Sequence, residues 1–139
     1  MNEIVVGVFT VIGVGLGAFL TYLFSKRSEF EKHLKQLETQ AYVDFIKAVA
    51  GISSAQREKD TKKQIEHELL MSDAKARICI YGKSEVIMSI ASFWRKGAGL
   101  SEEGSRNFLE VIKSLRKAST PGNKELTKED MNQLLFGRD

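Results

Sequence analysis

Residues 4–24 read IVVGVFTVIGVGLGAFLTYLF and contain no charged side chain. As an α-helix this run of 21 residues is about 31 Å long, close to the hydrocarbon thickness of a bilayer. A secretory signal peptide is the main alternative, but the segment Met1–Glu3 carries no Lys or Arg and the apolar stretch is too long for a cleaved core. The sequence therefore predicts an uncleaved transmembrane helix over residues 4–24.

Basic residues begin directly after this run and define its expected orientation. Lys26 and Arg27 are the first of the 21 Lys and Arg residues, all of which follow the run. The positive-inside bias places that side in the cytoplasm and the amino terminus outside, as in a single-pass protein of the bacterial inner membrane. Tyr22, Lys26 and Arg27 are then expected to anchor the helix at the inner interface. The only cysteine, Cys79, agrees with a reducing compartment.

Small residues form a stripe along the predicted transmembrane helix. Gly7, Thr10, Gly13, Gly17 and Thr21 recur at intervals of three and four residues, so they share one helix face. Such a face lets other helices approach closely in lipid, and it favours self-association over a monomeric anchor with an unused face. Because one span cannot enclose a channel, any passage of ions would require several copies.

Helical periodicity continues beyond the predicted membrane segment. No Pro or Gly occurs between Ala18 and Ala50, which predicts an unbroken continuation into a long helix over about residues 25–58. The apolar positions of this segment are spaced almost wholly by threes and fours: Phe30, Leu34, Leu37, Ala41, Phe45, Ala48, Ile52 and Ala55.

Four further helices are expected, over about residues 62–81, 85–96, 102–118 and 128–136. Their start signals are polar capping residues: Thr61 with Gln64, Ser84, Ser101 or Ser105, and Thr127 with Asp130. Gly82 suits a left-handed position that ends the helix before it. These segments predict an all-α protein in which one amino-terminal transmembrane helix continues into a cytoplasmic antiparallel helical bundle over residues 25–139.

Each helix has an apolar stripe that the bundle is expected to bury. In order along the chain, the expected buried residues of the second to fourth helices are Ile65, Leu69, Ala76 and Ile80, then Ile87, Ile90, Ala91 and Trp94, then Phe108, Ile112 and Leu115.

The joint at Gly82-Lys83-Ser84 is the strongest candidate for a binding site. It is similar to the end of a phosphate-binding P-loop, but that motif needs a glycine where Arg77 stands. A weaker anion or nucleotide site, with Arg77, Lys83 and Ser84 at a helix amino terminus, remains as the functional interpretation. An ordinary joint between two helices is the interpretation that this pattern favours, because every helix has a free amino terminus.

No pattern of catalytic or metal-ligating residues is present in the sequence. Arg27 and His33 have the R-x5-H spacing of the ribonuclease motif of HEPN domains, but Ser28 replaces the usual Asn, Asp or His and the pair directly follows the membrane segment. His67 is the only other histidine. With a net charge of +3 and only short basic clusters, no direct nucleic-acid partner is expected. We therefore expect no enzyme activity, no cofactor and no metal.

Two segments carry a resemblance to known proteins. QLETQAYVDFIKAVAGISSAQR and AKARICIYGKSEVIMSIASFWR resemble a group of short, mostly uncharacterised bacterial single-pass membrane proteins that share an AKARIxxYGxxEV-type helix joint. The resemblance covers about residues 4–96. In architecture alone, the chain also looks like the pore-forming accessory membrane protein of RNA-targeting CRISPR systems, which has one amino-terminal span and a helical HEPN-like domain.

The first group has no agreed activity, whereas the architectural resemblance to the CRISPR accessory protein implies a pore. We therefore expect a homo-oligomer, assembled through its cytoplasmic helical bundle, that acts on the lipid bilayer as an effector or pore in bacterial anti-phage defence. Two other functions stay open at this point. The span could tether a bundle that recruits a cytoplasmic protein partner, such as another defence protein, or the joint at Lys83 could sense a nucleotide signal.

Overall fold

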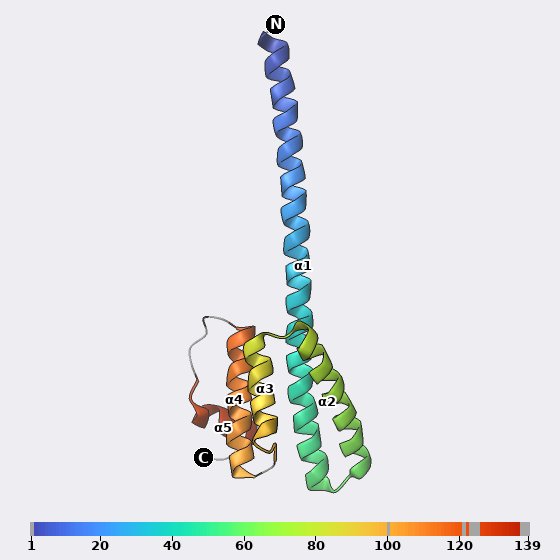
Figure 1. Ribbon diagram of the computed structural model, residues 1–139, viewed down its shortest axis with the longest axis vertical. Coiled ribbons are helices and arrows are strands. Elements are labelled where there is room, and N and C mark those ends of the chain that lie inside the picture. The colour runs from blue at the N-terminus through green and yellow to red at the C-terminus, as the bar shows by residue number, and fades with distance from the viewer. Residues whose placement is uncertain (1, 100, 121, 123–125, 137–139) are drawn as a thin grey trace. The chain divides into compact units, whose positions relative to one another are not determined.

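The computed structural model describes residues 2–99, 101–120, 122 and 126–136, and it describes the side chains of these residues except 2–12, 135 and 136. Within this part of the chain the secondary structure is entirely helical, so the all-α prediction is confirmed (Figure 1). The helices are α1 (Asn2–Glu58), α2 (Thr61–Tyr81), α3 (Ser84–Arg95), α4 (Glu102–Ser119) and α5 (Lys128–Phe136).

The chain divides into two compact units, Met1–Leu37 and Glu38–Asp139. The first unit contains the amino-terminal part of α1, and every side chain from Gly13 to Gln36 is exposed. The second unit contains the remainder of α1 and the other four helices. All the buried residues of the described chain belong to this second unit.

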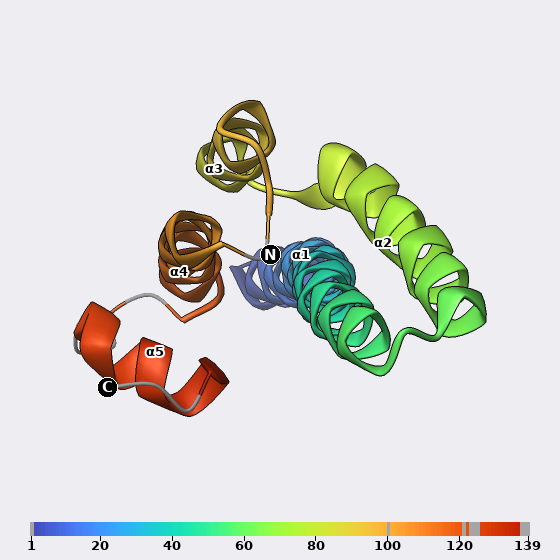
Figure 2. The same cartoon turned by 90° about the horizontal axis from the view of Figure 1, so that it is seen from below.

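One apolar core holds the second unit together. Figure 2 looks along the helix axes and shows α2, α3 and α4 arranged around α1. The ring of Phe93 lies 5.7 Å from that of Phe108, which joins α3 to α4. The buried residues of the core come from α1 to α4: Ala41, Tyr42, Phe45, Ala48, Met71, Ala74, Ile78, Val86, Ile90, Phe93, Phe108, Val111, Leu115 and Ala118.

The turn between α1 and α2 is shorter than the sequence pattern indicated. Lys59 has a positive φ of 58°, and the N–H of Asp60 donates to the carbonyl of Ala55 at 2.9 Å. This tight reversal makes Asp60 the N-cap residue, and its side chain accepts the N–H of Lys63 at 3.0 Å. The predicted capping by Thr61 is wrong, because Thr61 already lies in the first turn of α2.

The start signals of α4 and α5 are confirmed. The hydroxyl of Ser101, rather than that of Ser105, accepts the N–H of Gly104 at 3.0 Å. Thr127 and Asp130 form a reciprocal capping box: the Asp130 N–H donates to the Thr127 hydroxyl at 3.1 Å, and the Asp130 carboxylate accepts the Thr127 N–H at 3.3 Å. These two contacts are local in sequence, which is why the pattern revealed them.

Gly82 separates α2 from α3 without the predicted left-handed conformation. Its φ of −75° and ψ of 154° are extended, and its N–H donates to the carbonyl of Ile78 at 2.7 Å. A Cβ at Gly82 would lie 2.5 Å from the same oxygen, so glycine is needed for the close approach rather than for a positive φ. Helix α3 begins at Ser84, so Lys83 is its N-cap residue, and its side chain makes no capping hydrogen bond to the first turn. The predicted capping by Ser84 is therefore also wrong.

The face of α2 that packs into the core is not the predicted one. Met71, Ala74 and Ile78 are buried, whereas the predicted stripe is exposed, with exposed fractions of 55% for Ile65 and 72% for Ile80. Helix α2 carries apolar residues on two opposite sides, and periodicity alone does not distinguish them. We call the exposed stripe Ile65, Leu69, Ala76 and Ile80 the outer face of α2.

The buried face of α3 also differs from the face predicted for it, whereas the buried face of α4 is the predicted one. Val86 and Phe93 join Ile90 in the core, while Trp94 is 40% exposed. The ammonium group of Lys75 lies 4.6 Å from the centre of the Trp94 ring, which accounts for an aromatic side chain at the surface. In α4, Phe108 and Leu115 are buried and Ile112 packs against the core, as expected.

Candidate functional site

Helix α1 includes the predicted transmembrane segment, residues 4–24. The side chains of residues 4–12 lie outside the described part of the structure, and the described side chains from Gly13 to Phe24 are all exposed. Among the described residues, no helix is long and apolar enough to cross a membrane. The large apolar side chains that the chain leaves uncovered in this segment are Val14, Leu16, Phe19, Leu20, Tyr22, Leu23 and Phe24.

The small-residue stripe is described for three of its five members. A Cβ at Gly13 or Gly17 would meet no atom within 4 Å, so this helix face is open. The hydroxyl of Thr21 donates to the carbonyl of Gly17 at 2.8 Å, which satisfies the side chain within its own helix. Gly7 and Thr10 lie outside the described side chains.

Among the described residues, the contacts of the predicted interface anchors lie within their own helix. The ammonium group of Lys26 lies 5.8 Å from the centre of the Tyr22 ring. Arg27 pairs with Glu31, with 3.1 Å between Nε and Oε1, and both side chains are largely exposed. Arg27 therefore has Glu31 rather than His33 as its partner, and nothing in the structure joins the two residues of the R-x5-H pair.

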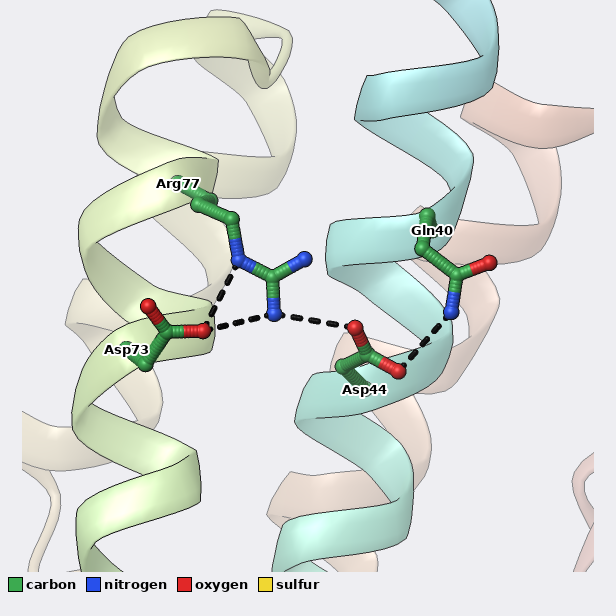
Figure 3. Close-up of polar contacts among 4 residues, drawn as sticks. All are labelled: Gln40, Asp44, Asp73 and Arg77. Carbon is green, nitrogen blue, oxygen red and sulfur yellow. Dashed lines mark hydrogen bonds and ion pairs between the residues drawn. The ribbon is translucent and has the colours of Figure 1, made fainter.

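A cluster of polar side chains joins α1 to α2 (Figure 3). The guanidinium of Arg77 lies between two carboxylates, with Nη2 2.9 Å from Asp44 Oδ2 and 2.8 Å from Asp73 Oδ2. Gln40 donates its amide N–H to the other oxygen of Asp44 at 2.9 Å. Arg77 and Asp44 are about one-third exposed and come from different helices, so this ion pair links the surface edges of α1 and α2.

The charge of Asp44 is favoured by this arrangement. Burial raises the pKa of its carboxyl, but the hydrogen bonds from Arg77 and Gln40 outweigh that effect, so the pKa lies below its usual value. A carboxylate whose pKa is lower in the folded state stabilises the fold above the unfolded pKa, and it loses that contribution as the pH falls. Its side-chain exposure keeps the expected energy small.

The joint between α2 and α3 is held by Lys83 and Tyr42. The backbone N–H of Lys83 donates to the Tyr42 hydroxyl at 3.0 Å, and that hydroxyl donates to the carboxylate of Glu38 at 2.8 Å. The Lys83 ammonium group donates to the carbonyl of Ala118 at 3.0 Å, near the carboxyl terminus of α4. Lys83 is therefore hydrogen-bonded to both α1 and α4.

These contacts give the residues of the predicted anion site separate partners. Arg77 is bound to Asp44 and Asp73, whereas the Lys83 ammonium group is bound to a backbone carbonyl. Ser84 is the exposed first residue of α3. The anion site stays a prediction. Within the described residues, no group of His, Cys, Asp and Glu side chains is arranged to hold a metal ion.

Sequence reasoning missed Asp44, Tyr42 and Glu38 as partners of this region. They lie on α1, 33 residues from Arg77 in the case of Asp44 and 41 residues from Lys83 in the case of Tyr42. Helical periodicity reports which residues share a face of one helix, and it contains no signal for such distant pairs.

The Asp44–Arg77 pair should contribute more stability than an exposed pair within one helix. A double-mutant cycle with Asp44→Asn and Arg77→Gln, measured by urea unfolding at pH 7, should give a coupling free energy of about 0.5–1 kcal/mol. The same cycle with Arg27→Gln and Glu31→Gln is the control and should give less than about 0.3 kcal/mol. The first coupling should decrease below about pH 4, where carboxylates bind protons. Equal couplings in the two cycles would contradict the interpretation.

Tyr42 should make the stability of the second unit sensitive to alkali. Burial, opposed by the hydrogen bond from Lys83 and reinforced by Glu38, raises the pKa of Tyr42 from 10.0 to about 12. The neutral Tyr42 hydroxyl should therefore make its full contribution to the free energy of unfolding below pH 10, and this contribution should be lost as the pH rises towards 12. Tyr42→Phe should lower the free energy of unfolding at pH 7 by about 1–2 kcal/mol and reduce this alkaline loss. Tyr22→Phe is the control, and an identical alkaline loss in both variants would show that Tyr42 is not responsible.

Comparison with known proteins gives no relative for this chain. No family model matches it, and neither a characterised protein nor a solved structure is significantly similar to it.

Proposed function

We propose that the chain is a membrane-anchored, homo-oligomeric helical protein that acts on the bilayer as an effector or pore. The observation that carries this proposal is the uncharged run of residues 4–24, whose described apolar side chains have no cover within the chain. In this proposal the run crosses the bacterial inner membrane once. The amino terminus is then outside, and residues 25–139 are in the cytoplasm.

The free energy of hydration supports a lipid environment for this helix. Burying one large apolar side chain is worth about 1.5–3 kcal/mol. The seven large side chains from Val14 to Phe24 are each 46–69% exposed, so leaving them in water costs roughly 5–10 kcal/mol. In this proposal the bilayer supplies the missing apolar cover along the 21 residues of the uncharged run.

Close packing between copies supports self-association within the membrane. Lipid chains are as apolar as the helix, so helices associate there through close backbone approach and van der Waals contact. Gly13 and Gly17 leave an open face with nothing within 4 Å of a Cβ, and the hydroxyl of Thr21 is already satisfied by Gly17. Several copies that meet along this stripe are what a pore requires, because each copy contributes one span.

A role in bacterial anti-phage defence follows from the architectural resemblance to the pore-forming accessory proteins of RNA-targeting CRISPR systems. What this chain shares with them is an apolar amino-terminal helix followed by an all-helical domain. The partners in this proposal are the lipid bilayer and further copies of the chain.

A tether that recruits a cytoplasmic protein is the second candidate function. The outer face of α2 favours it, because Leu69 and Ile80 are 68% and 72% exposed on a helix whose opposite side is already packed. A nucleotide-sensing effector has less support, since the ammonium group of Lys83 is bound to the carbonyl of Ala118. The experiment below separates the pore from the tether.

Gly13→Ile and Gly17→Ile should each raise the dissociation constant of the oligomer in the membrane at least about tenfold. The reason is that each added side chain separates the backbones of neighbouring copies. Cross-linking in native membranes measures the assembly, and a voltage-sensitive dye in cells that overproduce the protein measures the leak of ions. Leu16→Ile, off the stripe, is the matched control and should leave both signals unchanged.

A pore should lose cross-linking and leak together in the stripe variants. A tether whose bundle alone oligomerises should keep its cross-links and show no leak in any variant. Unchanged cross-linking, together with no depolarisation by the parent protein, would therefore reject the pore and favour the tether.

The orientation has its own test. A reporter enzyme that is active only in the cytoplasm, fused after Asp139, should be active, because Lys26 and Arg27 hold their side of the helix inside. A periplasm-specific reporter at the same position is the control and should be silent. Activity of the periplasmic reporter would overturn the proposed orientation.

A further inference from the structure

The part of α1 that follows the predicted membrane segment carries an apolar stripe of its own. Phe30, Leu34 and Leu37 recur at intervals of four and three residues, so they share one face of the helix. Phe30 is 62% exposed, Leu34 is also exposed and Leu37 is half-buried. We call these three residues the stalk face. Since every described side chain from Gly13 to Gln36 is exposed, Phe30 and Leu34 have no cover within the first unit.

The stalk face has the spacing of a coiled-coil heptad. Phe30 and Leu37 occupy d positions, and Leu34 occupies the a position between them. Arg27 occupies the a position before them. A single polar residue at an a position is compatible with a coiled coil and fixes its register. The guanidinium of Arg27 is already paired with Glu31 of its own helix, so it does not place an unpaired charge at the seam.

The charges beside the stalk face are complementary between parallel copies. In a parallel coiled coil, a residue at g faces the next e position of the partner helix. Lys26 is at g and Glu31 is at that e position, so two copies can form this ion pair twice. Among the described residues, Lys26 contacts the ring of Tyr22 rather than a carboxylate. Arg27 contacts only Oε1 of Glu31, which leaves the other carboxylate oxygen for a second cation.

The same charges disfavour an antiparallel pair. Antiparallel helices place g residues opposite g residues and e residues opposite e residues. Lys26 and Glu31 would then lie on different sides of the seam, and the ion pair between copies would be lost. The parallel arrangement is also the one that two copies have when both are anchored in one membrane with the same orientation.

The stalk face is separate from the small-residue stripe of the predicted membrane segment. Thr21 and Phe30 are nine positions apart, which at about 100° per residue places them on opposite sides of α1. A copy that meets one neighbour through the stalk face therefore keeps the face of Gly17 and Thr21 for another. Two contacts on opposite sides of one helix let an assembly grow beyond a pair, as the proposed pore requires.

We propose that the stalk face packs against the same face of a second copy, in a parallel coiled coil in which Lys26 of each copy binds Glu31 of the other. A coiled coil of about two heptads is too short to hold free chains together. The contact therefore rests on the proposed membrane anchoring, which confines the copies and orients them alike. It assigns the surface through which the homo-oligomer assembles beside the bilayer.

Disulfide formation between copies tests the register of this contact. In the full chain with Cys79→Ser, single cysteines are introduced at the two a positions by Arg27→Cys and Leu34→Cys. The matched controls, Ser28→Cys and Lys35→Cys, lie one residue further along and are equally exposed. On mild oxidation of native membranes, both a-position variants should give at least about fivefold more dimer than the controls, because a residues of parallel helices meet their own counterparts. An antiparallel pair cannot join both a-position variants, since these residues are one heptad apart.

Charge reversal tests the ion pair between copies. In the chain with Leu34→Cys, Lys26→Glu or Glu31→Lys alone should lower the yield of dimer at least about threefold, because like charges then face each other twice. Membranes that contain both variants, each with its own tag, should recover the disulfide between unlike chains, since unlike charges then meet at both positions. Loss of the Arg27–Glu31 pair within one helix would not be rescued by mixing, so recovery is specific to a contact between copies.

Three results would overturn the proposal. The first is an equal yield of dimer from all four single-cysteine variants, and the second is a higher yield from the two controls. The third is the absence of recovery when the two charge variants are mixed. None of the substituted residues belongs to the apolar core of the second unit, so a change in yield does not report unfolding of that unit.

The proposed function is measured separately on the same membranes, through the leak of ions. Cross-links at both a positions without a leak in the parent would reject the pore and retain the stalk contact. A leak without these cross-links would reject the stalk contact and retain the pore. A chain that is absent from the membrane fraction would overturn the anchoring, and with it this contact.

Discussion

The buried stripe of α1 from Ala41 to Ala55 is the constraint on which the second unit depends. Ala41, Phe45 and Ala48 are almost completely inaccessible, and the core residues of α2, α3 and α4 belong to the same cluster. Phe45 is the largest fully buried side chain of this stripe. Because close-packed interiors respond to changes of a single methylene, this stripe determines which faces of the other helices can be buried.

Polar contacts then determine how the helices are joined at their edges. The Arg77–Asp44 pair links α2 to α1 at the surface, whereas the hydroxyl of Tyr42 and the ammonium group of Lys83 tie the joint between α2 and α3 to α1 and α4. Gly51 and His67 make a different kind of link, in which packing is close but a ring nitrogen is left without a partner. The same pair of helices is thus held by an ion pair at one position and by the close packing of an imidazole against a glycine at another.

The two units present opposite distributions of apolar surface. The second unit has one apolar core, while the outer face of α2 leaves Ile65, Leu69 and Ile80 exposed. The first unit exposes every described side chain from Gly13 to Gln36, including seven large apolar ones between Val14 and Phe24. An uncharged helix without cover in its own chain is the physical basis of the proposed anchoring in lipid.

Much of the fold was predictable from local sequence because helix formation depends on neighbouring residues. The all-helical class, the Ser101 cap and the Thr127–Asp130 capping box involve residues within one turn of each other. The apolar stripe of α1 was equally visible, since one helix face is defined by its own spacing.

Only the tertiary structure decided which face of α2 is buried, since Met71, Ala74 and Ile78 compete with an equally periodic stripe and the neighbouring helices choose between them. It also decided the backbone of Gly82, whose extended conformation depends on where α3 begins. Asp44, Ala118 and Gly51, which contact Arg77, Lys83 and His67, lie on other helices, at sequence separations where periodicity carries no information. Local sequence therefore determined the helices and the caps at Ser101 and Thr127, while packing between helices determined which of their side chains meet.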